Sequence, residues 1–282
     1  MDFNNTQIAF NRFTSVEMKW QVLLFQLMGK QGFINMGAKL TQFAFQCHLP
    51  IKPLVKKTMF LQFCGGESLE ECQQKILPAL EKDKIQVSLH YSVEGDGTED
   101  DYRTAYEQTI FLIKKQGNHK KKSVCFSVIK PSGLIPLELL HKWSDQKPLS
   151  VAEKQAVSLF TERMHNLARA CEESGGSLLV DAEETWIQGA IDQVAYELMQ
   201  KFNKKRAVVY TTMQMYRKDR LHYLNEMIEL AQKEAFFLGI KLVRGAYMVF
   251  EAQFAAEHGK ENPIFPEKSL TVDYVEDLMR WQ

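Results

Sequence analysis

Two cations and an aromatic residue stand within one short apolar run, Ile240–Met248, which reads IKLVRGAYM. Lys241 and Arg244 interrupt the run, and Gly-Ala-Tyr ends it at what we predict to be the carboxyl end of a strand. In a closed parallel barrel, side chains at the carboxyl ends of the strands face a shared pocket. Cations beside an aromatic ring there indicate a site for an anionic ligand next to a flat one.

The spacing of these two cations limits how both could be used. Lys241 and Arg244 fall on opposite faces of a regular strand, because successive side chains alternate between faces. Only one of them can then point into the barrel, unless a bulge near Gly245 turns Arg244 inward. The sequence leaves open which cation faces the pocket.

Two further charged residues stand at the ends of other apolar runs. Lys130 follows Val124–Ile129 and precedes Pro-Ser-Gly, so it stands where a strand stops and the chain turns. Asp181 follows Leu178–Val180 in the same way. A lysine there can simply extend its ammonium to solvent, and an aspartate there can cap the next helix. These alternatives stay open for each residue taken alone.

Gln214 ends a further run, Val208–Met213. Its amide can donate and accept, as recognition of a heteroaromatic edge requires, although a glutamine that satisfies loop backbone is an equal alternative. Together these strand ends offer cations for an anionic group, a carboxylate to orient the site and Tyr247 as a face for a small ring. Because no Ser-His or Cys-His pair stands in these positions, chemistry by a bound cofactor is favoured over hydrolysis.

The elements that must position these residues alternate between strand and helix patterns. The predicted strands are Ile85–Val93, Val124–Lys130, Leu178–Glu183, Ala207–Gln214 and Ile240–Tyr247. Each is followed by a helical pattern or by the chain end, which predicts a parallel sheet. No glycine-rich nucleotide loop follows a strand, and polar residues mark several strand ends, so a barrel is favoured over a doubly wound sheet.

We therefore predict an α/β chain with a (βα)8 TIM-type barrel that is incomplete, since only five strand-helix units precede the last helical pattern, Val272–Trp281. Gly239 stands where the preceding helix pattern, Lys218–Phe237, needs a left-handed terminator. Mostly helical patterns fill the first part of the chain, which predicts an α-helical region over residues 1–84 and a partial barrel over residues 85–282.

Composition narrows the class of protein. The 282 residues are 45% hydrophobic and 25% charged, which is typical of a globular chain. Lys+Arg and Asp+Glu both total 35, so the field of the whole protein gives no reason to expect nucleic acid as a partner. The 5 cysteines form no C-x-x-C pair and the 7 histidines show no metal-ligand spacing, so we expect reduced cysteines and no metal.

No transmembrane segment is predicted, because the longest early apolar stretch, Val22–Met28, is far too short to span a bilayer. The first twenty residues lack the pattern of a secretory or transit peptide. We therefore expect a cytoplasmic location, and peripheral attachment at the inner membrane stays open.

Several long motifs in order give the chain a specific resemblance to the proline dehydrogenase family, and more closely to its eukaryotic-like branch. The resemblance runs from about residue 85 to the end. The motifs are LHYSVE at Leu89–Glu94, SVIKPSGL at Ser127–Leu134, LLVDAE at Leu178–Glu183, QMYRKD at Gln214–Asp219 and GIKLVRGAYM at Gly239–Met248.

The resemblance implies a barrel that holds FAD at the carboxyl ends of its strands and oxidises L-proline to pyrroline-5-carboxylate. Electrons would pass to a quinone or another acceptor, and a partnership with pyrroline-5-carboxylate dehydrogenase stays open. Asp181 and Lys241 would be catalytic, with Asp181 organising the site. Lys130 would contact the substrate carboxylate, and Tyr247 would pack on the proline ring. The resemblance further implies that the flavin is lined by Ala182, Gln214, Arg244, Gly245 and Ala246.

Two departures from the family pattern stand out. Lys241 falls where many bacterial members have Arg, and Arg244 falls where they have Lys, so the roles of the two cations could be exchanged. The last three strands of the family and its final helix, which carries a paired Arg that clamps the substrate, have no counterpart before Gln282. We therefore expect a carboxyl-terminal truncation, and the activity and flavin binding of the 282-residue chain stay open. Hydroxyproline oxidation and a catalytically inactive binding protein are the alternatives.

Overall fold

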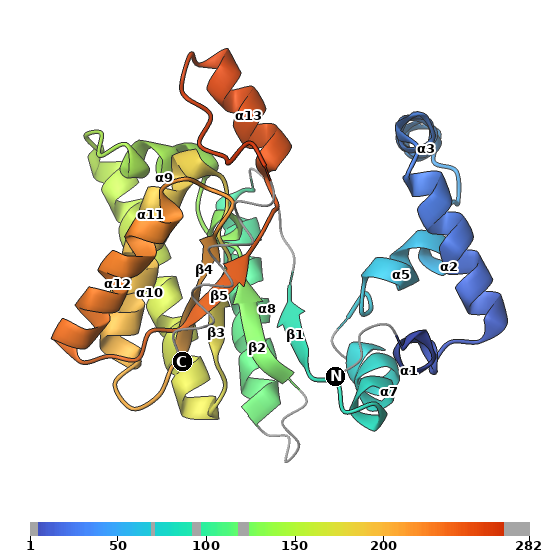
Figure 1. The fold of residues 1–282 in the computed structure, drawn as a ribbon, viewed down its shortest axis with the longest axis horizontal. Helices are drawn as coiled ribbons and strands as arrows, with labels where there is room; N and C mark the ends of the chain where they lie inside the picture. The colour runs from blue at the N-terminus through green and yellow to red at the C-terminus, as the bar shows by residue number, and fades with distance from the viewer. Residues whose placement is uncertain (1–4, 69–70, 92–96, 118–123, 268–282) are drawn as a thin grey trace. The chain divides into compact units, whose positions relative to one another are not determined.

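The computed structural model describes residues 5–68, 71–91, 97–117 and 124–267. The chain divides into two compact units, Met1–Ala79 and Leu80–Gln282, and each is described by itself. The predicted helix Val272–Trp281 lies outside the described residues, as do residues 92 and 93 of the first predicted strand. Figure 1 shows the elements in chain order from blue to red.

The first unit is helical in its described residues. Its second helix begins after Thr14, whose side chain accepts from the backbone N–H of Glu17 while the Glu17 carboxylate accepts from the backbone of Thr14. This capping box accounts for the sharp start of the helix. The helices are α1 (Thr6–Phe10), α2 (Ser15–Met28), α3 (Gln31–Gln46), α4 (Lys52–Val55) and α5 (Leu61–Phe63), with π-helical turns at Lys56–Phe60 and Cys72–Ile76 and with α7 (Leu77–Lys82) across the boundary.

The second unit is built on a five-stranded sheet in which every neighbouring pair is parallel. The strands follow one another in sequence order, which is the order of a barrel, and the predicted parallel α/β architecture is confirmed. They are β1 (Val87–His90), β2 (Val124–Ile129), β3 (Leu178–Val180), β4 (Val209–Gln214) and β5 (Ile240–Val243).

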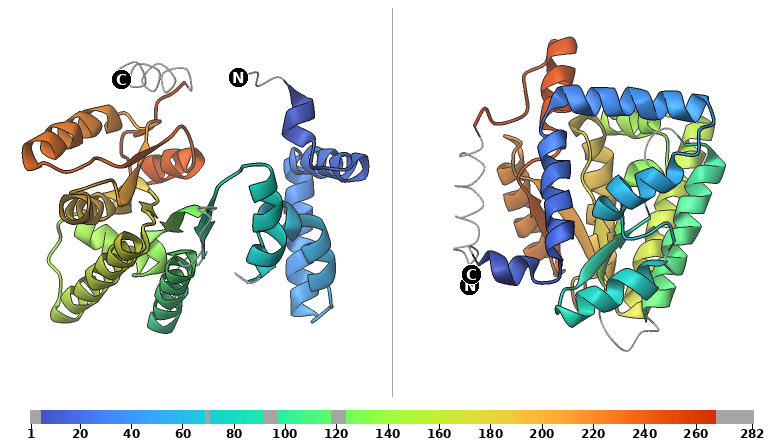
Figure 2. Two further views of the ribbon diagram at one scale, coloured as in Figure 1. Left: turned by 90° about the horizontal axis from the view of Figure 1, so that it is seen from below. Right: turned by 90° about the vertical axis from the view of Figure 1, so that its right-hand side faces the viewer.

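Helices follow every strand, and those after β1 to β4 pack against one face of the sheet (Figure 2). The main core lies between the sheet and these helices, where Leu178, Val180 and Val209 pack with apolar side chains of the helices. Because side chains alternate along a strand, Leu179 and Asp181 fall on the opposite face. The helices are α8 (Glu99–Gly117), α9 (Leu137–Ser144), α10 (Val151–Ser174), α11 (Thr185–Phe202), α12 (Arg220–Glu234) and α13 (Met248–Glu257).

The prediction that Gly239 terminates the helix before β5 is wrong. That helix, α12, ends at Glu234, and Ala235 takes the left-handed conformation with φ 52°. Gly239 is required for another reason, since a Cβ there would lie 2.4 Å from the carbonyl oxygen of Val209. The glycine lets the chain enter β5 in close contact with the start of β4.

All five strands are shorter than predicted: β1 spans only Val87–His90, β2 ends before Lys130, and β4 begins at Val209 and not at Ala207. β5 ends at Val243 and not at Tyr247, because Val243 pairs with Gln214, the last residue of β4, and no strand partner continues beyond it. β3 ends at Val180 and not at Glu183. The residues predicted to form the site therefore lie partly on the strands and partly on the connections that follow them.

Candidate active site

The carboxyl end of the sheet brings three polar side chains together from three strands. The ammonium of Lys241 lies 2.5 Å from an Asp181 carboxylate oxygen, and the Thr212 hydroxyl donates to the same oxygen at 3.2 Å. Thr212 is directly opposite Lys241 in the β4–β5 register. All three share the sheet face that lies away from the helix core.

Lys241, and not Arg244, occupies this face within β5. Its neighbour Leu242 packs with the cluster around Met213 on the helix side, so the alternation of the strand turns Lys241 toward Asp181. The Lys241 side chain is 38% exposed, which leaves the paired ammonium accessible to a ligand. Arg244 follows the end of the strand and is exposed.

Asp181 does not cap the following helix. The N-cap position of α11 is Glu184, and the Asp181 carboxylate is turned to Lys241 and Thr212. Its backbone N–H donates to the Ile129 carbonyl at 2.9 Å, which ties the end of β3 to the end of β2. The carboxylate is thus held from β4 and β5, and the backbone of Asp181 is held from β2.

Lys130 stands between β2 and a turn that a buried carboxylate secures. The 3-10 turn Pro131–Gly133 follows Lys130 directly, and Glu183 accepts the backbone N–H of Ser132 at 2.8 Å as well as its hydroxyl. Burial raises the pKa of Glu183 to about 7, against the opposing effect of these two hydrogen bonds. Glu183 therefore links the connection after β3 to the one that carries Lys130.

Gln214 is fully buried and its amide already has protein partners. It donates to the Glu183 carbonyl at 2.7 Å and to the Tyr216 hydroxyl at 2.9 Å, and it accepts from Arg217 at 3.2 Å. These bonds link the end of β4 to Glu183 and to the connection that follows β4. The predicted contact of its amide with a flavin stays a prediction.

A chain of buried polar residues extends from the site into α11 and α12. The backbone N–H of Glu183 donates to Gln188 at 2.8 Å, Gln188 donates to Asp192 at 2.7 Å, and Arg220 donates to Asp192 at 2.6 Å. Sequence reasoning missed these residues. A signal existed, because Gln188 and Asp192 stand four residues apart on the buried face of an amphipathic helix.

Tyr247 is the N-cap residue of α13, four residues after the end of β5. Its backbone N–H donates to the hydroxyl of the buried Tyr216 at 3.4 Å. Gly245 and Ala246 are exposed, whereas Ala182 at the end of β3 is buried. Figure 1 shows α13 beyond the carboxyl ends of the strands, and Tyr247 directly precedes this helix.

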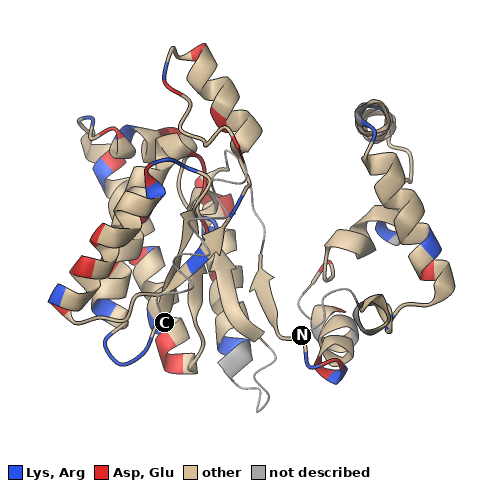
Figure 3. Cartoon of the chain, in the orientation of Figure 1, with Lys and Arg blue, Asp and Glu red and all other residues tan. Residues whose placement is uncertain are grey.

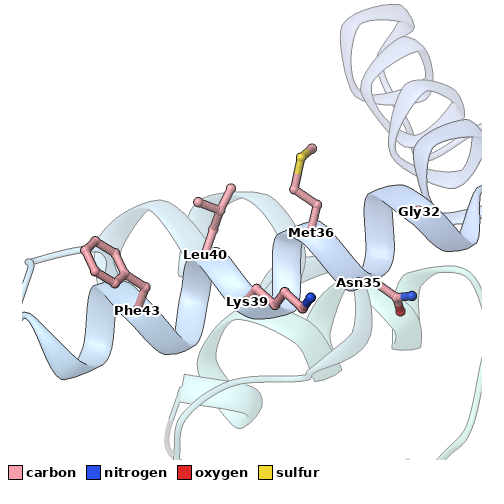
Figure 4. Close-up of a pocket in the computed structure, with 6 residues that line it drawn as sticks. All are labelled: Gly32, Asn35, Met36, Lys39, Leu40 and Phe43. Atoms are coloured by element: carbon pink, nitrogen blue, oxygen red, sulfur yellow. The ribbon is translucent and has the colours of Figure 1, made fainter.

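Two hollows lie elsewhere in the described chain. One, of about 320 Å³, is lined by residues of α9, α11, α12, α13 and the connections beside them. The other, of about 520 Å³, lies along α3, where Met36 and Leu40 point to the same side of the helix (Figure 4). All its lining residues come from that one helix, so it lacks the convergent polar groups of a ligand site.

Basic and acidic residues are interspersed over the helices of the second unit (Figure 3). In the part of the chain that the structure describes, no group of three or more His, Cys, Asp or Glu side chains is arranged to hold a metal ion. Among the helices of that part, none is long and apolar enough to cross a membrane.

The family model for proline dehydrogenase matches residues 73–280. The chain belongs to the proline dehydrogenase family. Proline dehydrogenase 1, mitochondrial, of Arabidopsis thaliana is 30% identical to it over 251 residues, which cover 75% of this chain and 50% of the relative. The carbapenem antibiotics biosynthesis protein CarD of Pectobacterium carotovorum subsp. carotovorum is 36% identical over 186 residues, which cover 66% of this chain and 49% of the relative.

A solved structure shares the fold. Proline utilization A from Bdellovibrio bacteriovorus, inactivated by N-propargylglycine, matches 82% of this chain and 25% of its own with a TM-score of 0.68 at 19% identity. The chain spans about half the length of the curated proline dehydrogenase relatives it matches. Its five parallel strands correspond to a half-barrel of the proline dehydrogenase domain.

Proposed function

We propose that the protein oxidises L-proline to pyrroline-5-carboxylate with FAD as the electron acceptor. The observation that carries the proposal is the Lys241–Asp181–Thr212 cluster at the carboxyl ends of three strands, in a chain that belongs to the proline dehydrogenase family. Barrel enzymes build their sites from such strand ends. The proposed activity is that of the whole protein. Dye reduction by the purified 282-residue chain measures how much of this activity the chain has by itself.

The donor set of the site fits a flavin beside an anionic substrate. Lys241 is half-exposed and stays paired with Asp181, so its remaining N–H groups can face an electron-rich ring edge while the carboxylate fixes its position. Arg244, Gly245 and Ala246 are exposed on the connection after β5, where side chain and backbone donors are accessible. We assign the flavin to Lys241 and this connection, with Ala182 and Gln214 at its inner side.

The residues of this chain then bind and orient the substrate. Lys130 supplies a positive charge for the proline carboxylate, and Tyr247 packs on the ring. Oxidation of the C5–N bond removes a hydride from C5 and a proton from the nitrogen. FAD, when bound, supplies the two-electron acceptor for the hydride. Asp181 keeps Lys241 in place, so positive charge stands where negative charge develops.

The remaining assignments follow from the same proposal. The electrons pass to a quinone or another acceptor, and the product is a substrate for pyrroline-5-carboxylate dehydrogenase. Peripheral attachment at a membrane is compatible with the described helices, none of which is long and apolar enough to cross one.

Dye reduction with proline, in native protein and in two Lys241 variants, tests the proposal. We expect Lys241→Met to lower kcat/KM for proline by about 100-fold, because a fixed positive charge is lost where charge develops. Lys241→Arg keeps the charge and should stay within about tenfold of native, with the difference arising from donor geometry.

Lys218→Met is the matched control, since Lys218 is an exposed lysine paired with Glu261 outside the site. It should leave kcat/KM unchanged. The proposal is wrong if the native protein carries no flavin and reduces no dye with proline, or if Lys241→Met behaves like the Lys218 control. The same dye-reduction assay with hydroxyproline in place of proline gives the ratio of the two kcat/KM values and therefore the preferred substrate.

A further inference from the structure

A buried carboxylate on α13 is bound by the first residue of α11. Glu251 is 1% exposed, and its two oxygens accept the backbone N–H of Thr185 at 2.7 Å and the Thr185 hydroxyl at 2.5 Å. A buried carboxylate is costly unless hydrogen-bonded, so this paired contact strongly favours one docking position of α13.

The contact supplies a cap that α11 does not make for itself. α11 begins at Thr185, and its N-cap residue, Glu184, makes no side-chain capping hydrogen bond. The first N–H groups of a helix have no partners within the helix, and the positive end of the helix dipole favours an anion. Glu251 therefore acts as an N-terminal cap donated by another helix.

An aromatic stack reinforces the same junction. Phe254, one turn after Glu251, lies over Trp186 with ring centroids 3.9 Å apart and an interplanar angle of 21°. Trp186 follows Thr185 directly, so a polar and an aromatic contact join the same two helix turns. These contacts leave α13 little freedom to slide along α11.

The junction joins the two connections that carry the proposed site. α11 begins directly after residues 181–184, which include Asp181, and α13 begins directly after residues 244–247, which include Tyr247. Movement of α13 would displace Tyr247, because Tyr247 is the N-cap residue of this helix and its carbonyl accepts the backbone N–H of Glu251 at 2.9 Å.

We propose that Glu251 is a positioning residue: by capping α11 it holds α13 in place and thereby fixes residues 244–247 against the end of β3. The docking follows from the structure alone, and its effect on substrate binding rests on the proposed proline oxidation.

Hydrogen exchange of residues 244–257 in the full 282-residue chain tests the docking without any flavin or substrate. Glu251→Ala should speed exchange in this segment about tenfold, since an N-terminal cap and its partner are lost together. Thr185→Ala removes only the hydroxyl donor and should speed it about threefold, and Thr185→Ser should restore the native rate.

Glu257→Gln is the matched control, because Glu257 is an exposed glutamate on the same helix that bonds only within it, to Gln253. Its exchange should equal that of the native protein. The docking role is refuted if exchange in Thr185→Ala and Glu251→Ala stays within twofold of the control. If Glu251→Ala does not fold, the hydrogen-exchange rate of Thr185→Ala relative to the control tests the docking role by itself.

Proline kinetics form the second arm of the test. A loosened Tyr247 should raise the KM for proline about tenfold in Glu251→Ala and change kcat less, because packing on the ring is a binding contact. Faster exchange with an unchanged KM would refute the positioning of Tyr247 and leave the docking intact. Faster exchange in a chain that oxidises no proline would instead count against the proposed function.

Discussion

Asp181 is the residue on which the proposed chemistry of this site depends. Its carboxylate is shared between the Lys241 ammonium on β5 and the Thr212 hydroxyl on β4. The Asp181 side chain is only 19% exposed. Removal of either partner of such an ion pair leaves the other charge partly buried and unpaired, which is destabilising. We therefore infer that the main role of the pair is to hold the Lys241 ammonium in one position, and that its net contribution to folding stability is small.

Sequence could predict the charged residues at strand ends because a charge that ends an apolar run is conspicuous. Asp181 was found in this way, and Lys241 was found because it interrupts an apolar run. Glu183 was not singled out, although it is buried and bonded to Ser132, which stands far away in the sequence. Such partners depend on which connections meet in the folded sheet, and no local pattern contains that information.

Glu183 makes stability depend on pH. Its pKa is about 7 in the folded protein against an ordinary value of 4.5, so between these values the folded state keeps a proton that the unfolded state has lost. The free energy of unfolding should therefore fall as pH rises from 4.5 to about 7, by about 3 kcal/mol from this residue. Below 4.5 the contribution of Glu183 is fully present.

Urea unfolding across this pH range, in native protein and in Glu183→Gln, measures the effect. The variant cannot titrate and should lack this decrease, so it gains about 3 kcal/mol relative to the native protein on going from acidic to slightly alkaline pH. Glu162→Gln, on the exposed face of α10, should follow the native curve. Parallel curves for Glu183→Gln and native protein would contradict the assignment.

At the scale of elements, strand and helix alternation was predictable and strand ends were not. Apolar runs between amphipathic helices predicted all five strands. The predicted end of β5 was four residues too late, because the prediction carried the strand past Arg244 to Tyr247, whereas its pairing with β4 stops at Val243. The end of a strand depends on its neighbour as well as on its own residues.

Asn203 joins three elements at the opposite end of the sheet from the site. Its fully buried side chain accepts the N–H groups of Val208 and Val209 at 2.9 and 2.8 Å, and it donates to the carbonyls of Val209 and Phe237. One side chain thus connects the end of α11 to the start of β4 and to the segment before β5.

We expect Asn203→Ala to lower the free energy of unfolding by about 3 kcal/mol, because several buried backbone groups lose their partner at once. Urea unfolding gives this value. Gln200→Ala is the control in the same helix, since Gln200 is exposed and makes one bond to Glu234; its loss should stay below about 1 kcal/mol. A comparable loss in both variants would contradict the role of Asn203.

At the scale of the whole molecule, the two units differ in how they bury apolar residues. The main core cluster lies between Ala105 and Phe236, entirely within the second unit. The first unit exposes large side chains such as Trp20, Phe25 and Phe43. The order of the strands and the family were predictable from sequence, since motifs and alternation are spread along the chain.

The second unit supplies five parallel strands, and the chain spans about half the length of its curated proline dehydrogenase relatives. The strand ends of this half-barrel carry Lys130, Asp181 and Lys241, the residues to which we assign substrate binding and charge stabilisation.

The most direct test of the account is the visible absorbance of the flavin in the purified protein, followed without oxygen as L-proline is added. The account predicts that FAD copurifies or binds on reconstitution and that proline bleaches its absorbance, with one pyrroline-5-carboxylate formed for each flavin reduced. Bound FAD whose absorbance stays unchanged in saturating proline, or a protein that takes up no FAD, would contradict it.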